Sequence, residues 1–155
     1  MNNKLISSKG YYNSQYSLKK TEEMSNEEEI IELIENNNKI IFIRNGSIIP
    51  IKNIPRVQDI VFFVKNIHLL NNEIILITSD GDRPIPSSYH SLLTNIILEN
   101  KMIKKWYTQN YDKSIIHEKI SYLPIGFDFH TPRDGLINDD KMNYIMNIVR
   151  ENNEN

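Results

Sequence analysis

Two aspartates separated by one glycine are the first residues in this sequence whose types and spacing suit chemistry. They follow the apolar run Glu73–Thr78, in the order Asp80, Gly81, Asp82 and Arg83 after one serine. The two carboxylates could share one divalent metal, because hard cations prefer carboxylate oxygens. Asp82 could instead act as a general base toward a sugar hydroxyl, with Asp80 and Arg83 as candidate substrate-binding residues. An ordinary acidic turn is the alternative to both roles.

A second cluster, of one aromatic residue and two amides, accompanies the apolar run Met102–Thr108. Trp106 is the single tryptophan of the chain, and Gln109 and Asn110 follow directly after the run. An indole ring can stack on a sugar or a base, and side-chain amides can hydrogen-bond to its polar groups. All three are therefore candidate substrate-binding residues. The alternative is that Trp106 belongs to the core and that the two amides form a turn.

A third cluster lies at the end of the run Lys119–Ile125. Gly126 permits a close approach of the backbone to a ligand and is a further candidate binding residue. Asp128 and His130 could form a catalytic acid–base pair, since a carboxylate orients an imidazole and raises its basicity. The alternative is a rigid loop rich in proline and glycine, in which His130 is a structural hydrogen-bond donor. The other histidines show no metal-ligand spacing, so no resident metal site is assigned.

Short runs rich in β-branched and aromatic residues alternate with helical patterns along the chain. Ser25 and Glu28 fit a capping box at the start of a helix that ends near Asn36. Further helices are expected over 87–99 and 139–150, and strands over 39–44, 59–65, 73–78, 102–108 and 119–125. The apolar runs lack strict alternation, as is typical of strands covered on both faces. We therefore predict an α/β fold, with a Rossmann-like, open, mostly parallel sheet and flanking helices.

The predicted sheet would bring the three clusters together, because ligands of open parallel sheets bind beyond the carboxyl ends of the strands. Residues 1–24 are polar and show no period, which predicts an amino-terminal arm. Residues 25–152 are predicted to form a single Rossmann-like domain, a size typical of one hydrophobic core.

Composition and charge exclude several function classes. The 155 residues carry a net charge of −2 and no cysteine, which excludes thiolate catalysis, disulfides and cysteine-ligated metals. Nucleic acid is not an expected partner, although a local basic patch is compatible with this net charge. The longest purely apolar run, 60–64, is too short to span a membrane, and the amino terminus shows no signal segment. We therefore expect a cytoplasmic protein with no membrane span.

Three sequence segments together resemble the amino-terminal half of exostosin-like glycosyltransferases, in the versions found in large DNA viruses and protists. The segments are ITSDGDRPIP over 77–86, IKKWYTQN over 103–110 and YLPIGFDFH over 122–130. The resemblance implies one lobe of a two-lobed fold of the GT-B type, with the sugar acceptor mainly on this lobe. It implies acceptor-side roles for Asp82, Gln109, Asn110 and Gly126, and by extension for Asp128 and His130.

The resemblance also implies a nucleotide-sugar donor on a second lobe, whose motifs this sequence lacks. The leading hypothesis is therefore a glycosyltransferase-like acceptor lobe that acts on a glycan, with a partner chain supplying the donor lobe. A divalent metal could accompany the nucleotide-sugar, and a viral protein would work in the host cytoplasm. A non-catalytic carbohydrate-binding or assembly module is the alternative. A third reading is a phosphatase-like hydrolase that uses Asp80 and Asp82, but Pro84 stands where that class has a hydroxyl residue.

Overall fold

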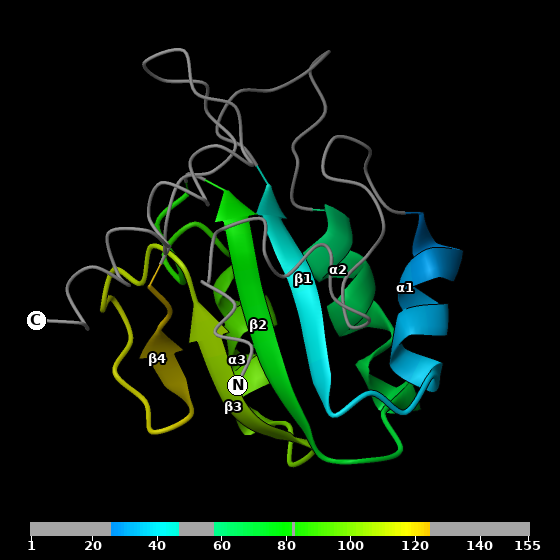
Figure 1. The fold of residues 1–155 in the computed structure, drawn as a ribbon. Coiled ribbons are helices and arrows are strands. Elements are labelled where there is room, and N and C mark those ends of the chain that lie inside the picture. The colour runs from blue at the N-terminus through cyan, green and yellow to red at the C-terminus, as the bar shows by residue number, and fades with distance from the viewer. Residues whose placement is uncertain (1–25, 47–57, 82, 125–155) are drawn as a thin grey trace, which may run out of the picture.

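The computed structural model of the chain describes residues 26–46, 58–81 and 83–124 (Figure 1). Four strands form one sheet in the order β1-β2-β3-β4, and every pair of neighbours is parallel. They are β1 (Ile40–Gly46), β2 (Ile74–Gly81), β3 (Ile103–Thr108) and β4 (Ile120–Tyr122). This confirms the predicted open α/β sheet of Rossmann-like type, with helices beside it.

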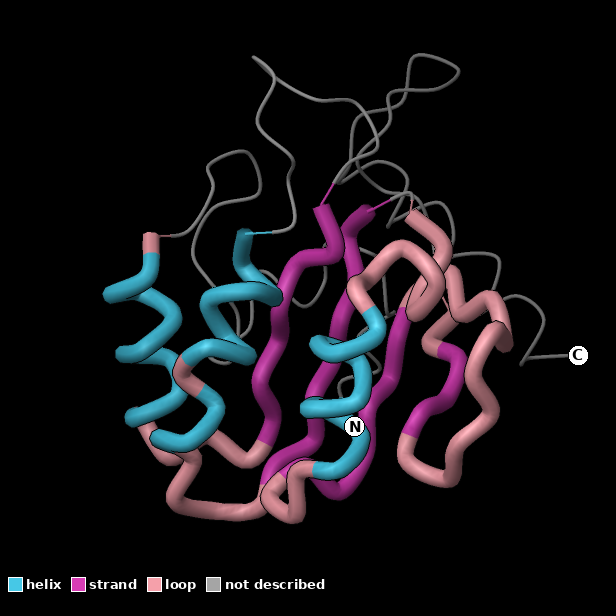
Figure 2. Tube along the Cα trace, turned by 180° about the vertical axis from the view of Figure 1, so that it is seen from behind, coloured by secondary structure: helices cyan, strands magenta, loops and turns pink. Residues whose placement is uncertain are grey.

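The helices of the described residues pack on one face of the sheet, as the view from behind shows (Figure 2). They are α1 (Glu27–Glu35), α2 (Gln58–Lys65), the short 3-10 helix η1 (Ile67–Leu69) and α3 (Ser91–Glu99). α2 lies between β1 and β2 in the chain, and α3 lies between β2 and β3. Each of these two connections leads to the adjacent strand. Both helices lie on the same face of the sheet, as two crossovers of the same handedness require.

Apolar side chains of the strands point to both faces of the sheet. Ile41 and Ile43 join the large core cluster beneath the helices, together with residues of all three α-helices. Phe42, between them in β1, belongs to a second cluster with Ile77 and Leu123 and is 1% exposed. Successive residues of a strand alternate between faces, so continuous apolar runs are what a sheet buried on both faces needs.

The strand predicted over 59–65 is wrong, because these residues form helix α2. The β-branched and aromatic residues favour a strand, but the tertiary contacts override that preference. Ile60, Phe63 and Ile67 are all buried, and their spacing of three and four residues is the helical one. A strand here would also leave only seven residues before the next one, whereas parallel neighbours need a crossover of a dozen or more.

The predicted capping box is displaced by one residue. Asn26, not Ser25, is the N-cap of α1, and its Oδ1 accepts a hydrogen bond from the Glu29 backbone N–H at 2.8 Å. The Glu29 carboxylate accepts in turn from the Asn26 N–H. An asparagine satisfies the free amides of a first helical turn as well as a serine does, so the sequence allowed either register.

The helix predicted over 87–99 begins four residues later than expected. His90 is the N-cap of α3, and its Nδ1 accepts from the Leu92 backbone N–H. Residues 84–89 form turns instead, with Ser88 N–H donating to the Pro84 carbonyl. β4 is likewise shorter than the strand predicted over 119–125.

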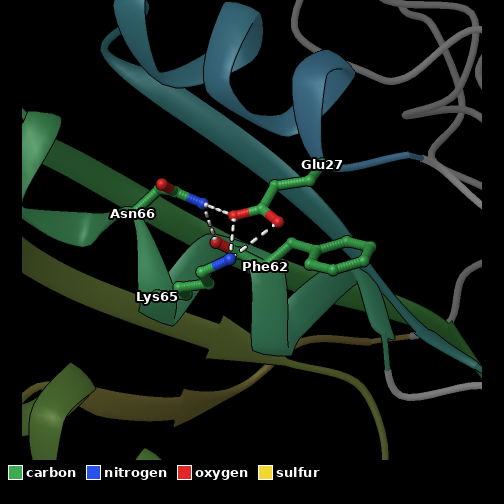
Figure 3. A network of polar contacts seen from close by, with 4 residues as sticks. All are labelled: Glu27, Phe62, Lys65 and Asn66. Carbon is green, nitrogen blue, oxygen red and sulfur yellow. Dashed lines mark hydrogen bonds and ion pairs between the residues drawn. The ribbon is translucent and has the colours of Figure 1, made fainter.

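An ion-pair cluster joins the start of α1 to the end of α2 (Figure 3). The Lys65 ammonium lies 2.8 Å and 2.9 Å from the two carboxylate oxygens of Glu27. The Asn66 amide donates both to Glu27 and to the Phe62 carbonyl, at 2.8 Å and 3.0 Å. These bonds lower the pKa of the Glu27 carboxyl below its usual 4.5. The cluster therefore fixes how the two helices pack on the sheet.

Several predictions fall outside the described residues, namely the arm over 1–24 and the helix over 139–150. The prediction of one domain over 25–152 is likewise tested only where the structure describes the chain. Within that part, no helix is both long and apolar enough to cross a membrane.

Candidate functional site

The residues that follow β2 and β3 are tied to each other by side-chain hydrogen bonds. The Ser79 hydroxyl donates to Gln109 Oε1 at 2.7 Å, and the Asn110 amide donates to the Gly81 carbonyl at 2.6 Å. The Gln109 backbone N–H extends the ladder by donating to the Thr78 carbonyl. The structure thus places Gln109 and Asn110 beside Ser79 and Gly81 at the carboxyl ends of neighbouring strands.

Asn110 shapes the connection after β3. Its φ of 58° is in the left-handed region, which asparagine tolerates better than most residues. Its carbonyl accepts from the Ile85 N–H, and the Asp112 N–H donates to the Ile85 carbonyl. The chain after β2 is therefore held against the chain after β3 over several residues.

Trp106 lies in the core, which was the alternative to a substrate-binding role. Its ring is fully buried and stacks on Tyr89, with centroids 6.1 Å apart and planes at 1°. Its Nε1 donates to the Thr78 hydroxyl at 2.9 Å, and that hydroxyl donates to Thr108 at 2.7 Å. The one hydrogen-bond donor of the indole ring is thus satisfied within the protein, so Trp106 supports the site from the core.

The polar groups of Gln109 are also hydrogen-bonded within the protein. It is 7% exposed, its Oε1 accepts from Ser79, and its carbonyl accepts from the Thr108 hydroxyl at 3.0 Å. This residue holds the ends of β2 and β3 in register. Its half-buried neighbour Asn110 is the more accessible of the two amides.

Asn45 and Tyr89, which the sequence analysis did not single out, belong to the same region. The Tyr89 hydroxyl donates to Asn45 Oδ1 at 2.8 Å, and both side chains are buried. Burial raises the pKa of the Tyr89 phenol well above its usual 10.0, so the phenol is neutral. The sequence signal for Asn45 was its place as the second polar residue after the apolar run 40–43.

Two buried donor atoms at this edge, Nδ2 of Asn45 and Nε of Arg83, have no hydrogen-bond partner among the described residues. Asn45 is 0% exposed and stands near the end of β1, while Arg83 follows β2. Asn45 is hydrogen-bonded to the Tyr89 hydroxyl, and the positive charge of Arg83 lowers the pKa of the same hydroxyl. Buried donors ordinarily have acceptors, so unsatisfied ones call for an explanation such as a bound group.

A buried ion pair completes the described part of this edge. Arg44 Nε lies 3.1 Å from Asp59 Oδ2, and the two side chains are 10% and 7% exposed. Arg44 belongs to β1 and Asp59 to the first turn of α2. The pair therefore fixes the start of α2 at the carboxyl end of β1.

The remaining predicted residues are placed only in part. Asp80 lies in β2, but its side chain is outside the described residues, as are Asp82, Gly126, Asp128 and His130 in full. The last described residues lie beside β3, since the Leu123 N–H donates to the Thr108 carbonyl at 2.9 Å. Among the described residues, no group of three or more histidine, aspartate or glutamate side chains is arranged to hold a metal.

Hydroxyl, amide and guanidinium groups at one strand edge suit a ligand rich in oxygen atoms, since they offer donors in fixed directions. We call this region, with Asn45, Arg83, Gln109 and Asn110, the carboxyl-edge site. Comparison of the chain with protein-family models, with curated proteins and with solved structures gives no match.

Proposed function

We propose that this chain is the acceptor-binding lobe of a glycosyltransferase and holds an acceptor sugar at the carboxyl-edge site. The observation that carries the proposal is a pair of buried donors that have no partner in the described part of the chain, Asn45 Nδ2 and Arg83 Nε. Hydroxyl oxygens of a sugar would supply the missing acceptors. The ordered motifs that resemble exostosin-like glycosyltransferases support the same substrate class.

In the proposed mechanism, the described residues bind and orient the acceptor. Arg83 and Asn45 donate to its oxygens, and Asn110 fixes the conformation of the chain at Gly81. Asp82 or His130 removes a proton from the acceptor hydroxyl, whose oxygen then attacks the anomeric carbon of the donor sugar. The bond from that carbon to the phosphate oxygen breaks, and the nucleotide leaves with the bonding electrons. A nucleotide-sugar, with or without a divalent metal, is supplied by a second lobe or a partner chain. Asp82→Asn should then lower turnover at least about tenfold, within the range expected for a general base.

A non-catalytic carbohydrate-binding module is the second candidate. Both polar atoms of the Gln109 side chain face the protein, at 2.7 Å from the Ser79 hydroxyl and 3.5 Å from the Gly81 carbonyl. Such a residue stabilises a binding surface and contributes no reacting group. This candidate predicts that the chain binds a glycan and transfers no sugar.

Thermal unfolding with a panel of nucleotide sugars and neutral oligosaccharides tests both candidates, with Mn²⁺ or with EDTA. A ligand at about 100 times its Kd adds about 2.7 kcal/mol to the stability. For a domain of this size, that raises the midpoint by roughly 5–10 °C. Both candidates predict a shift with an oligosaccharide, and transfer of a labelled sugar by this chain would reject the module.

Two matched variants locate the site within this experiment. Arg83→Met removes one of the two unsatisfied donors, whereas Lys39→Met removes an exposed cation just before β1. We expect Arg83→Met to abolish the thermal shift and Lys39→Met to retain it. A panel that gives no shift, or a shift that survives Arg83→Met, contradicts the proposal.

A further inference from the structure

A hollow of about 650 Å³ lies at the opposite end of the strands, where β3 begins. It is formed by the chain before β2, the turn between α3 and β3, the first half of β3 and the chain before β4. Its lining consists of four lysines, two glutamates and two apolar residues: Lys101, Lys104, Lys105, Lys119, Glu73, Glu118, Met102 and Ile103. We call this hollow the lysine groove.

The charges of the lysine groove do not cancel. Four ammonium groups face two carboxylates, which leaves two positive charges in a chain whose net charge is −2. Lys104 pairs with Glu73 at 2.6 Å, and both side chains are more than half exposed. Lys101 is exposed and makes no hydrogen bond or ion pair with the described residues. Positive charge concentrated in a concave surface attracts anions more strongly than the same charge on a convex one.

Two of the ammonium groups are held in place without being neutralised. Lys105 Nζ donates to the Glu118 carbonyl at 2.7 Å, and Lys119 Nζ donates to the Asn100 carbonyl at 2.8 Å. A backbone carbonyl carries no full charge, so neither hydrogen bond places a counter-charge beside the ammonium group. Each ammonium group has three N–H donors and thus keeps two for another acceptor. The side chains are ordered before a ligand arrives, which lowers the entropy cost of binding.

We propose that the lysine groove binds a compact ligand that carries two or more phosphate or sulfate groups. The volume lies within the range of small-molecule sites. A nucleic-acid polymer fits less well, because the two glutamates interrupt the basic surface and would repel a continuous run of phosphates. The proposal is independent of the carboxyl-edge site, which lies at the other end of the strands.

Binding of tripolyphosphate and of sucrose octasulfate, measured by calorimetry at low and at physiological salt, tests this proposal. The two probes distinguish a phosphate ligand from a sulfate ligand, and a single-stranded oligonucleotide tests the polymer. We expect at least one small probe to bind, and to bind more weakly as salt rises. The oligonucleotide should bind more weakly than that probe.

Two variants with opposite expected effects distinguish a change of binding at the groove from a loss of binding caused by unfolding. Lys101→Glu should weaken probe binding at least about tenfold, since it reverses one charge within a few ångströms of the ligand. Glu73→Gln removes a carboxylate and releases Lys104, so it should strengthen binding severalfold, which a merely unfolded variant cannot do. Lys113→Glu, an exposed residue on the chain after β3, is the matched control and should leave binding unchanged.

Three outcomes overturn the proposal. The first is that neither small probe binds at low salt. The second is that Lys101→Glu and Lys113→Glu weaken binding equally, which would indicate general attraction of the probe to the protein surface. Tighter binding of the oligonucleotide than of both small probes would assign the groove to a nucleic acid.

Discussion

Tyr89 and Trp106 lie face to face in the core, with their ring planes 1° apart and their centroids 6.1 Å apart. Tyr89 comes from the turns before α3, and Trp106 comes from β3. Each ring carries a polar atom to the carboxyl end of the sheet, where the Tyr89 hydroxyl meets Asn45 and the indole N–H meets Thr78. The stack therefore links the apolar core to the polar residues of β1 and β2.

Tyr89→Phe should destabilise the fold by about 1–3 kcal/mol, because it leaves the buried Asn45 Oδ1 without its donor. The ring stack is kept, so the loss reports the hydroxyl alone. Chemical denaturation of both proteins measures the difference in the free energy of unfolding. Tyr122→Phe, at a residue that is 55% exposed, is the control and should change the stability by less than about 0.5 kcal/mol. Equal effects of the two substitutions would contradict the role of the hydroxyl.

The same hydroxyl should make the fold sensitive to alkali. Burial raises the pKa of Tyr89 above its usual 10.0, so the folded state holds this proton more tightly than the unfolded state. Its contribution is complete below pH 10 and is lost progressively as the pH rises above that value. The stability of the wild type should therefore fall more steeply above pH 10 than that of Tyr89→Phe. Parallel curves for the two proteins would contradict this expectation.

At acid pH, the Glu27 cluster should be the sensitive element. Hydrogen bonds from Lys65 and Asn66 lower the pKa of Glu27, so the folded state favours the ionised carboxylate. This contribution is present above the usual pKa of 4.5 and is lost as the pH falls below it. The stability advantage of the wild type over Glu27→Gln should thus shrink between pH 6 and pH 3. Glu28→Gln, on the same helical turn and exposed, is the control; a constant advantage of the wild type over Glu27→Gln would contradict the expectation.

The buried pair of Arg44 and Asp59 should be worth far more than the exposed pair of Glu73 and Lys104. Asp59→Asn keeps the shape of the side chain but leaves a buried guanidinium without its carboxylate, which should cost about 3 kcal/mol. Glu73→Gln should cost less than about 1 kcal/mol, since that pair is more than half exposed.

A double variant separates the charge of this pair from the packing. Arg44→Met combined with Asp59→Asn removes both charges and should regain part of the stability lost in Asp59→Asn. Urea denaturation of the wild type, both single variants and the double variant gives the coupling free energy. If the double variant loses as much unfolding free energy as the two single variants together, the two residues do not interact.

The fold class could be predicted from the sequence because β1 and β2 begin with compact apolar runs, and β3 combines β-branched and aromatic residues. The prediction failed at 58–65, where local preference for a strand and the helical spacing of Ile60, Phe63 and Ile67 disagree. The helical spacing was the better predictor. A helix packs on a sheet through one apolar face, and that face is set by the spacing of its apolar residues and not by their types. The short connection to β2 also argued against a strand, because it has too few residues for a crossover between parallel strands.

The candidate site could be predicted only as a location. A parallel sheet brings the residues that follow neighbouring strands to the same edge, so polar residues after β2 and β3 are expected to lie close together. In the structure, Gln109 and Asn110 lie beside the chain at Ser79 and Gly81. The sequence could not tell whether Trp106 faces a ligand or the core, since an indole ring suits both. Asn45 and Tyr89 were missed because their relation is created by tertiary packing, 44 residues apart in the chain.

Asn110 offers a test of how the carboxyl-edge site is held, because it combines a left-handed backbone with a side-chain bond to Gly81. Asn110→Gly keeps the backbone conformation and loses the bond, which should cost about 1 kcal/mol. Asn110→Ala loses the bond and adds the strain of a positive φ at a residue with a Cβ, for a total of about 2–3 kcal/mol. Thermal and urea unfolding of both variants measure the difference. If glycine and alanine cost the same, the backbone conformation of Asn110 contributes nothing, and if neither has a cost, its side chain does not hold the chain after β2.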